Sequence, residues 1–331
     1  MTGCSRTTPE SRVVQMMYRL AHASIGAAAL LLLGAPASAK DVPPADLGEF
    51  RDFLGSSAPS FDSTDELVKQ FRSVLAEGDK AKLATLLGLS PNRVEKSDEV
   101  AQSLPEIQAE AAKSIGVKQL DPDRVMLLLG DQLWPFPFPA IRKGGKWSFA
   151  TVLGLEEVIN RRIGENELTT IANLRQIVEA QERYRATDWD QDGVDEYAEK
   201  LISSPGKYDG LYWRPGDGVP DSPIGPGLSE AELATAAKDG YFGYRYRVLT
   251  RQGSHVAGGA YSYMINGNMI AGFGVIATPF IYDRTGVMTF VVNQHGTVYQ
   301  KDFGPNTAKL AAGIKSFDPD DSWDLVEDPG D

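Results

Sequence analysis

The chain has 331 residues, of which 42% are hydrophobic and 24% charged, a balance that excludes a largely disordered protein. Its 33 Lys and Arg against 45 Asp and Glu give a formal net charge of −12, so nucleic acid is not an expected partner. The single cysteine excludes a disulfide scaffold and the common cysteine-based zinc sites. This length favours two domains.

Residues 1–39 are predicted to be a signal peptide. Arginines precede the apolar run 24–34, and Ala37-Ser38-Ala39 supplies the small residues that signal peptidase requires. The run is too short to cross a bilayer, which needs about 20 apolar residues. A start at Met17 instead of Met1 also leaves a signal of ordinary length. We expect a periplasmic or secreted bacterial protein without a transmembrane anchor after cleavage.

The first part of the mature chain is predicted to be helical. Residues 40–60 are rich in proline and small polar residues and are interpreted as a linker. Ser63 and Glu66 form a capping-box pattern, in which each side chain serves the other's backbone amide, and Gly78 ends the helix. A short helix is expected over 79–87.

A third helix begins near Ser97, and we expect Pro105 to interrupt it. From Arg124 the apolar period changes to that of strands, with Gly144-Gly145 as a hairpin turn. Helices followed by an antiparallel sheet predict an α+β domain over 61–160, similar to the cone-shaped NTF2-like arrangement.

A second α+β domain is predicted over 161–331. Apolar residues recur every three or four positions from Leu168 to Tyr184, which predicts one helix from Asn166 with a buried stripe. Short strands follow beyond residue 243, and turns such as Asn266-Gly267 separate them. One long helix followed by an antiparallel meander resembles the head of a pilin. The five expected strands cover residues 243–250, 261–265, 271–279, 286–293 and 297–303.

Several local sequences together resemble the bacterial DUF2950 family from about residue 61 to 325. They are Trp134–Pro139, Arg161–Glu167, Asp209–Trp213, Ser222–Pro226, Gly258-Gly259 and Thr285–Phe290. The resemblance implies an exported family of unassigned activity. Within it, residues 171–303 are similar to type IV pilin and pseudopilin heads, although a whole domain precedes the helix here. A pilus subunit built on a buried apolar helix is therefore not expected.

An acidic segment matches the twelve-residue calcium loop position by position. Asp188, Asp190 and Asp192 take ligand positions 1, 3 and 5, Val194 offers its carbonyl, and Glu199 takes the bidentate position 12. Against a paired calcium loop, position 8 is acidic and no second such loop exists in the chain. The alternative is a solvated turn that ends the helix.

For the other candidate residues, the sequence favours a structural role over a catalytic or binding role. The aromatic residues of 134–138 and of 208–213 could form a stacking surface for sugar or peptide, but core packing is the more ordinary role. His255 lies in a glycine-rich loop without a nucleophile-elbow motif, and the S-x-x-K match at Ser204 contains Pro and Gly. Arg161-Arg162 beside Glu165 and Glu167 is typical of an ion-pair network.

These patterns favour an envelope protein that acts by binding or assembly, stabilised by Ca²⁺, with an envelope protein or polymer as partner. No catalytic residue is assigned. The alternative is a periplasmic hydrolase or carbohydrate-active enzyme, with its site in the first domain's cone or between the domains.

The signal peptide can be tested directly. We expect N-terminal sequencing of the protein from periplasm or medium to begin at Lys40, because Ala37 and Ala39 meet the small-residue requirement before that position. Recovery of an intact 24–34 segment in the membrane fraction would contradict cleavage.

Overall fold

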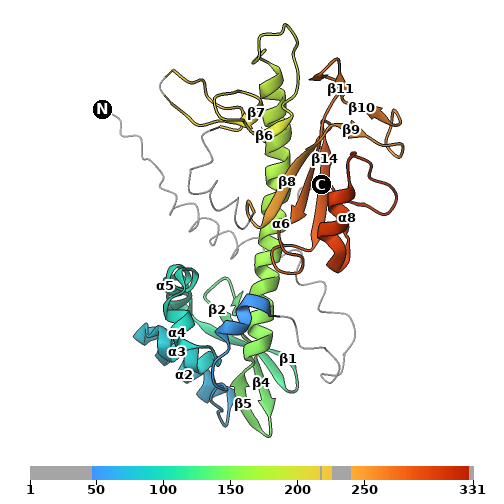
Figure 1. Cartoon of the computed structure of the whole chain (residues 1–331). Helices are drawn as coiled ribbons and strands as arrows, with labels where there is room; N and C mark the ends of the chain where they lie inside the picture. Colours follow the sequence, from blue (N-terminus) through green and yellow to red (C-terminus); the bar gives the residue numbers. More distant parts are fainter. Residues whose placement is uncertain (1–46, 217, 226–239, 328–331) are drawn as a thin grey trace. The chain divides into compact units, whose positions relative to one another are not determined.

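The computed structural model describes residues 47–216, 218–225 and 240–327 (Figure 1). The predicted signal peptide and its cleavage site lie outside these residues. The chain divides into two compact units, one ending at Ile159 and the other beginning at Asn160. Helices and antiparallel sheets occur in both units, which confirms the α+β class. Within the described ranges, no helix combines the length and apolar character that crossing a membrane requires.

The first unit packs short helices against an antiparallel sheet of order β1-β2-β4-β5, with β3 paired to β2. Phe71, in helix α2 (Thr64–Glu77), lies at the centre of this core. Its ring is 4.8 Å from that of Phe136 and 5.5 Å from that of Phe149. The helices are η2 (Gly48–Phe53), α2 (Thr64–Glu77), α3 (Lys80–Leu87), α4 (Pro91–Glu95) and α5 (Asp98–Lys113). The strands are β1 (Ile115–Asp121), β2 (Arg124–Leu129), β3 (Trp134–Pro135), β4 (Ala140–Lys143) and β5 (Lys146–Phe149).

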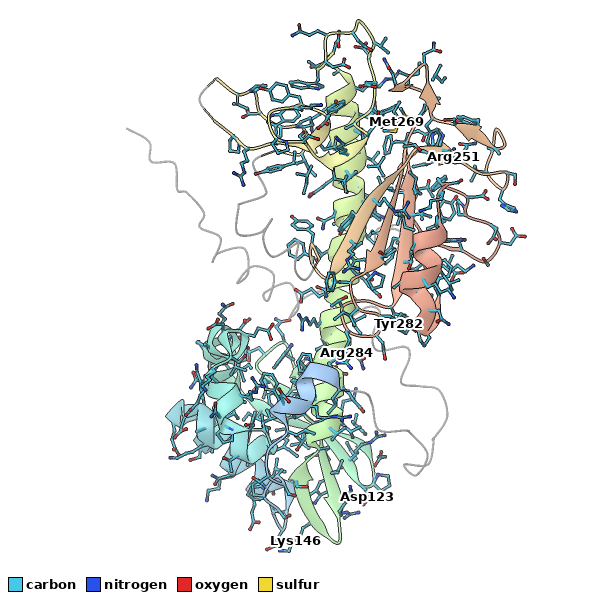
Figure 2. All side chains as sticks on the ribbon, in the orientation of Figure 1. Asp123, Lys146, Arg251, Met269, Tyr282 and Arg284 are labelled. Carbon is cyan, nitrogen blue, oxygen red and sulfur yellow. The ribbon has the colours of Figure 1, made fainter. Side chains whose placement is uncertain are left out.

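The cap of α2 differs in detail from the expected reciprocal box. Ser63 Oγ accepts from the Glu66 amide at 3.2 Å as predicted, but Glu66 Oε2 accepts from the amide of Asp62, one residue earlier. The Asp62 carboxylate in turn forms an ion pair with Lys146, which lies at the start of β5 (Figure 2). Lys146 Nζ is 2.7 Å from Asp62 Oδ1. The box therefore also joins the helix start to the β4–β5 hairpin.

The predicted interruption at Pro105 is wrong, because α5 continues through it to Lys113. A proline there leaves the carbonyl of Ala101 without its helical partner. Both Ala101 and Pro105 are exposed, so water can satisfy that carbonyl and the helix survives.

Two further segments differ from their sequence interpretation. Leu47 and Phe50, near the middle of the predicted linker, are buried around η2. The sequence does not indicate strand β1. Most of its side chains are exposed, so its residues do not alternate between apolar and polar as those of a half-buried strand do.

Helix α6 (Thr151–Arg185) begins 15 residues before the expected Asn166. Its residues up to Ile159 belong to the first unit and the rest to the second. In the second unit Leu174, Ile177 and Tyr184 form the buried stripe as predicted. Leu168 does not share it, since 58% of its surface is exposed.

The second unit contains an antiparallel sheet of order β16-β15-β14-β13-β8 with a helix on each face. One face packs on α6, and the other packs on α8. Arg247 of β8 fixes α8 to the sheet, because its guanidinium donates to the carbonyls of Ala311 and Ile314 at 3.1 and 2.8 Å. The strands of this sheet are β8 (Tyr244–Leu249), β13 (Gly274–Pro279), β14 (Met288–Asn293), β15 (Tyr299–Asp302) and β16 (Asp324–Leu325).

The second unit also contains shorter strands and helices outside this sheet. The β11–β12 hairpin turns at Asn266-Gly267, where both residues have positive φ as the predicted turn requires. Helix α8 (Thr307–Gly313) and strand β16 were not predicted. The remaining elements are β6 (Lys200–Ile202), β7 (Gly210–Tyr212), β9 (Arg251–Gln252), β10 (Tyr261–Ser262), β11 (Met264–Ile265), β12 (Asn268–Met269) and η3 (Gly304–Asn306).

Glu167 of α6 anchors the start of β14. One carboxylate oxygen accepts from the amides of Val287 and Met288 at 2.8 and 2.9 Å. We expect Glu167→Ala to lower the free energy of unfolding by about 2 kcal/mol, because two part-buried amides lose their acceptor. Thermal and urea unfolding would measure the loss.

Two neighbouring variants control for this effect. Glu167→Gln keeps an oxygen acceptor and should cost less than Glu167→Ala, whereas exposed Leu168→Ala should change stability by less than about 0.5 kcal/mol. Equal losses in Glu167→Ala and Leu168→Ala would contradict the anchoring role.

Candidate metal centre

The acidic loop, residues Asp188–Glu199, begins where α6 ends and is anchored by an aromatic residue. The indole N–H of Trp189 donates to the Tyr184 carbonyl at 3.0 Å. Its ring packs against those of Tyr184, Tyr208 and Trp213, with centroids 4.8 to 6.1 Å apart. The aspartates on either side of Trp189 are thereby held at the end of the helix.

Backbone amides turn the three aspartates toward one another. Asp188 accepts from the amides of Gly193 at 2.9 Å and Asp192 at 3.2 Å, and Asp192 accepts from Val194 at 2.8 Å. Gly193 has a φ of 85°, which a residue with a side chain adopts only with strain. One carboxylate oxygen from each of Asp188, Asp190 and Asp192 lies within 4.8 Å of the other two. The structure thus brings together three of the five predicted ligands.

A hairpin holds the other side of the loop. Met269 of β12 (Figure 2) donates its amide to Glu196 at 3.1 Å and accepts from the Tyr197 amide at 2.9 Å. The side-chain amide of Asn268 donates to Asp192 Oδ2 at 2.5 Å. These contacts, which the sequence did not indicate, connect the loop to a segment about 75 residues further along the chain.

The other two predicted ligands are placed less tightly. Val194 is half-buried and donates its amide within the loop. Glu199 is exposed, lies directly before β6, and is not part of the three-aspartate group. A strand, not a helix, follows the loop, so the segment is not a helix–loop–helix unit.

The loop concentrates negative charge. The Gly193 amide is the main cause of the lowered pKa of Asp188, which holds this carboxylate in its charged form. Burial raises the pKa of Glu196, and the charges of Asp190, Glu199 and Asp192 also raise it. A bound cation would relieve this repulsion. Hard carboxylate oxygens on a tight loop are the donor set that Ca²⁺ prefers, so the residues present fit that ion.

Most residues of the two aromatic clusters lie in the core, as predicted, whereas Trp134 and Tyr208 are half-buried. Phe136 and Phe138 are buried in the first unit. Tyr212 and Trp213 are buried in the second, and the Trp213 indole N–H donates to the Pro220 carbonyl at 2.7 Å.

The two histidines of the described chain are exposed. His295 lies in the turn after β14, where its amide donates to Asn293 Oδ1. His255 faces Asp318, with Nδ1 2.9 Å from one carboxylate oxygen and its amide donating to the other at 2.8 Å. The hydrogen bond with Asp318 raises the pKa of His255. Sequence reasoning found no acidic partner for this histidine, because the pair is 63 residues apart.

A Lys–Ser–Asp cluster was also missed. Lys200 Nζ donates to Ser204 Oγ at 2.8 Å and to Asp209 at 2.7 Å, and the Ser204 amide and hydroxyl both donate to Asp209. The cluster therefore holds the loop that joins β6 to the parallel strand β7.

Glu165 is half-buried in α6, and burial raises its pKa to about 7. Neighbouring Asn166 is buried and donates to the Thr285 carbonyl at 2.9 Å.

The fold and the acidic loop define an α+β protein with a candidate cation site. A family model described as "Protein of unknown function (DUF2950)" matches residues 58–326. The chain therefore belongs to the DUF2950 family. Neither curated proteins nor solved structures give a match.

Asp209 predicts a pH dependence of stability. Partial burial alone would raise its pKa, but hydrogen bonds from Lys200 and Ser204 outweigh burial and lower the pKa to about 2. A lowered carboxylate pKa stabilises the fold above about pH 4, and this contribution is lost as the pH falls toward 2. We expect Asp209→Asn to cost about 1 kcal/mol at pH 7, after allowance for solvent screening.

Unfolding at pH 7, 4 and 3 would measure this effect. The difference between wild type and Asp209→Asn should shrink as the pH falls, whereas exposed Asp195→Asn serves as a charge-matched control. A difference that stays constant with pH would contradict the assignment.

Proposed function

We propose that this chain is an exported protein of the bacterial envelope that acts by binding or assembly and is stabilised by Ca²⁺. The observation that carries the calcium proposal is the convergence of Asp188, Asp190 and Asp192 within 4.8 Å. Calcium takes six to eight oxygen ligands in flexible geometry, so the Val194 carbonyl and the Glu199 carboxylate complete the set when the loop closes on the ion. A single loop without a paired partner gives weak binding, with a Kd on the order of 0.1–1 mM.

The second unit is interpreted as a pilin-like head and the first as an NTF2-like domain. In support of the first likeness, one face of an antiparallel sheet packs on the stripe Leu174, Ile177 and Tyr184 of α6. This helix also carries many charged residues, among them Arg175 and Glu179, so it is not the apolar assembly helix of a pilus. The head is proposed to act through its surface.

Export is proposed from the sequence pattern of residues 1–39. Removal of that segment leaves a chain without cysteine, which suits an oxidising compartment. An envelope protein or polymer is the proposed partner class.

Calcium binding predicts a thermal shift. If only the folded state binds, a hundredfold excess over Kd stabilises it by about 2.7 kcal/mol. At about 10 mM CaCl₂, the mature protein should melt several degrees higher than in chelator, by the entropy scaling for chains of this size. Differential scanning fluorimetry would measure the shift, with NaCl of matched ionic strength as the control for screening.

Variants separate coordination from loop folding. Asp190→Asn is the sharpest test, because Asp190 is exposed and the backbone hydrogen bond that it accepts from the Asp192 amide is long, at 3.4 Å. It should remove most of the calcium shift with little effect on the melting temperature in chelator. Glu199→Gln should also reduce the shift, whereas Asp195→Asn should leave it unchanged. Equal melting temperatures in calcium and chelator, or a shift that survives Asp190→Asn, would reject the calcium proposal.

A further inference from the structure

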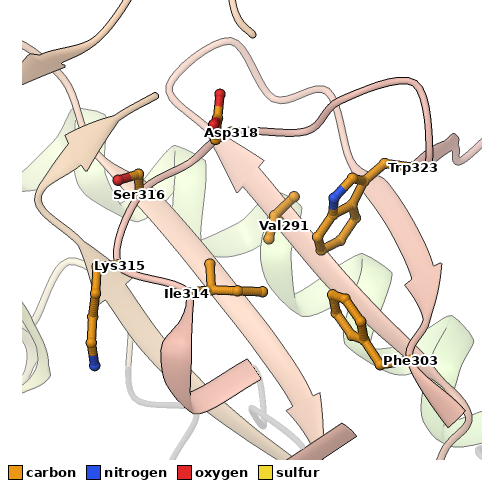
Figure 3. Close-up of a pocket in the computed structure, with 7 residues that line it drawn as sticks. All are labelled: Val291, Phe303, Ile314, Lys315, Ser316, Asp318 and Trp323. Atoms are coloured by element: carbon orange, nitrogen blue, oxygen red, sulfur yellow. The ribbon is translucent and has the colours of Figure 1, made fainter. Parts of the chain in front are cut away.

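A shallow, half-open cavity of about 310 Å³ lies on the α8 face of the second unit's sheet. Figure 3 shows Trp323 and Phe303 on one side of it, facing Ile314 and Val291. Asp318 and Ser316 lie at its other end, and Lys315 points away from the apolar side chains. This volume is at the small end of the range for ligand sites, and an apolar floor with a few polar groups is their usual composition.

Two aromatic rings form a corner in this cavity. The rings of Phe303 and Trp323 lie 5.6 Å apart with their planes at 82°. The Lys301 ammonium lies 5.1 and 5.9 Å from their centroids and donates to Ser322. Because Lys301 already supplies the cation at these rings, a cationic ligand would be repelled there.

The rim is acidic and held in place. Asp318 is fixed by the amide and imidazole of His255, and it packs so closely over Gly253 that a side chain there would collide with it. His255 also lines a second cavity, of about 410 Å³, together with Asp320 and Asp321. The His255–Asp318 pair thus lies between the two cavities, with Asp318 lining the first and His255 the second. Three carboxylates at this rim disfavour an anionic ligand and accept hydrogen bonds from hydroxyl groups.

We propose that these two cavities bind a neutral oligosaccharide. One sugar ring places its apolar face against the Trp323–Phe303 corner, and its hydroxyls bond to Asp318 and Ser316. The next ring lies in the second cavity, where Asp320 and Asp321 accept from its hydroxyls. The aromatic corner provides contact area, and the charges around it are of both signs, with Lys301 and Lys315 beside Asp318, Asp320 and Asp321, so neither a cation nor an anion meets a uniformly complementary surface. The inference rests on the proposed binding function, for which it names the ligand class, and it does not depend on calcium.

Isothermal titration of the mature protein with cellotetraose, chitotetraose and maltotetraose tests the proposal. At least one of these neutral probes should bind, and Trp323→Ala should weaken binding about tenfold through lost stacking. Tyr261→Ala is the matched control, since Tyr261 is an exposed aromatic residue of β10 that lines neither cavity. Binding unchanged in Trp323→Ala, or weakened equally in Tyr261→Ala, would overturn the proposal.

A second measurement on the unaltered protein covers the case in which Trp323→Ala does not fold. The indole N–H signal that disappears from the NMR spectrum of Trp323→Phe should shift in the wild type when the binding probe is added. No shift with any of the three probes at 10 mM, in protein that unfolds cooperatively, would overturn the saccharide assignment. The calcium shift is measured separately, so failure of that proposal is distinguished from failure of this one.

Discussion

The second unit depends on the contact between α6 and the face of the antiparallel sheet that packs against it. Leu174 and Ile177 pack in one cluster with Val275, Phe290 and Val292 from adjacent strands. The end of this helix then determines where the acidic loop begins, and Glu167 determines where β14 begins. One amphipathic segment therefore positions both the core and the candidate metal centre.

The sheet is covered on both faces, and this explains the composition of its central strands. In β14, Phe290 and Val292 face α6, whereas Val291 between them faces α8. A strand buried on both faces reads as a continuous apolar run without alternation. Only one face of a typical antiparallel sheet is buried, so this continuous apolar run indicates that a further element covers the second face. Helix α8 is that element.

Local signals predicted local structure well. The Ser63 and Gly78 caps and the Asn266-Gly267 turn depend on neighbouring residues only, and the structure confirms them, except that Glu66 accepts from the Asp62 amide and not from that of Ser63. The effect of Pro105 was not predictable, because its tolerance depends on which side of α5 faces water.

At the candidate site, too, contacts between neighbouring residues were predictable and contacts between distant segments were not. The spacing of Asp188, Asp190 and Asp192 on one loop predicts that they converge, and they do. The contribution of Glu196, Asn268 and Met269 could not be predicted, since their contacts join segments about 75 residues apart. The His255–Asp318 pair is hidden for the same reason, and no local motif marks it.

The two hydrogen bonds between the acidic loop and β12 have a consequence for local opening of the structure. The Tyr197 amide and the Met269 carbonyl pair directly, and the Met269 amide pairs with Glu196. Neither segment can separate without breaking both bonds and exposing Met269, whose side chain is fully buried. The loop and the β11–β12 hairpin should therefore open as one cooperative unit, and hydrogen exchange of the Tyr197 and Met269 amides should give the same free energy of opening.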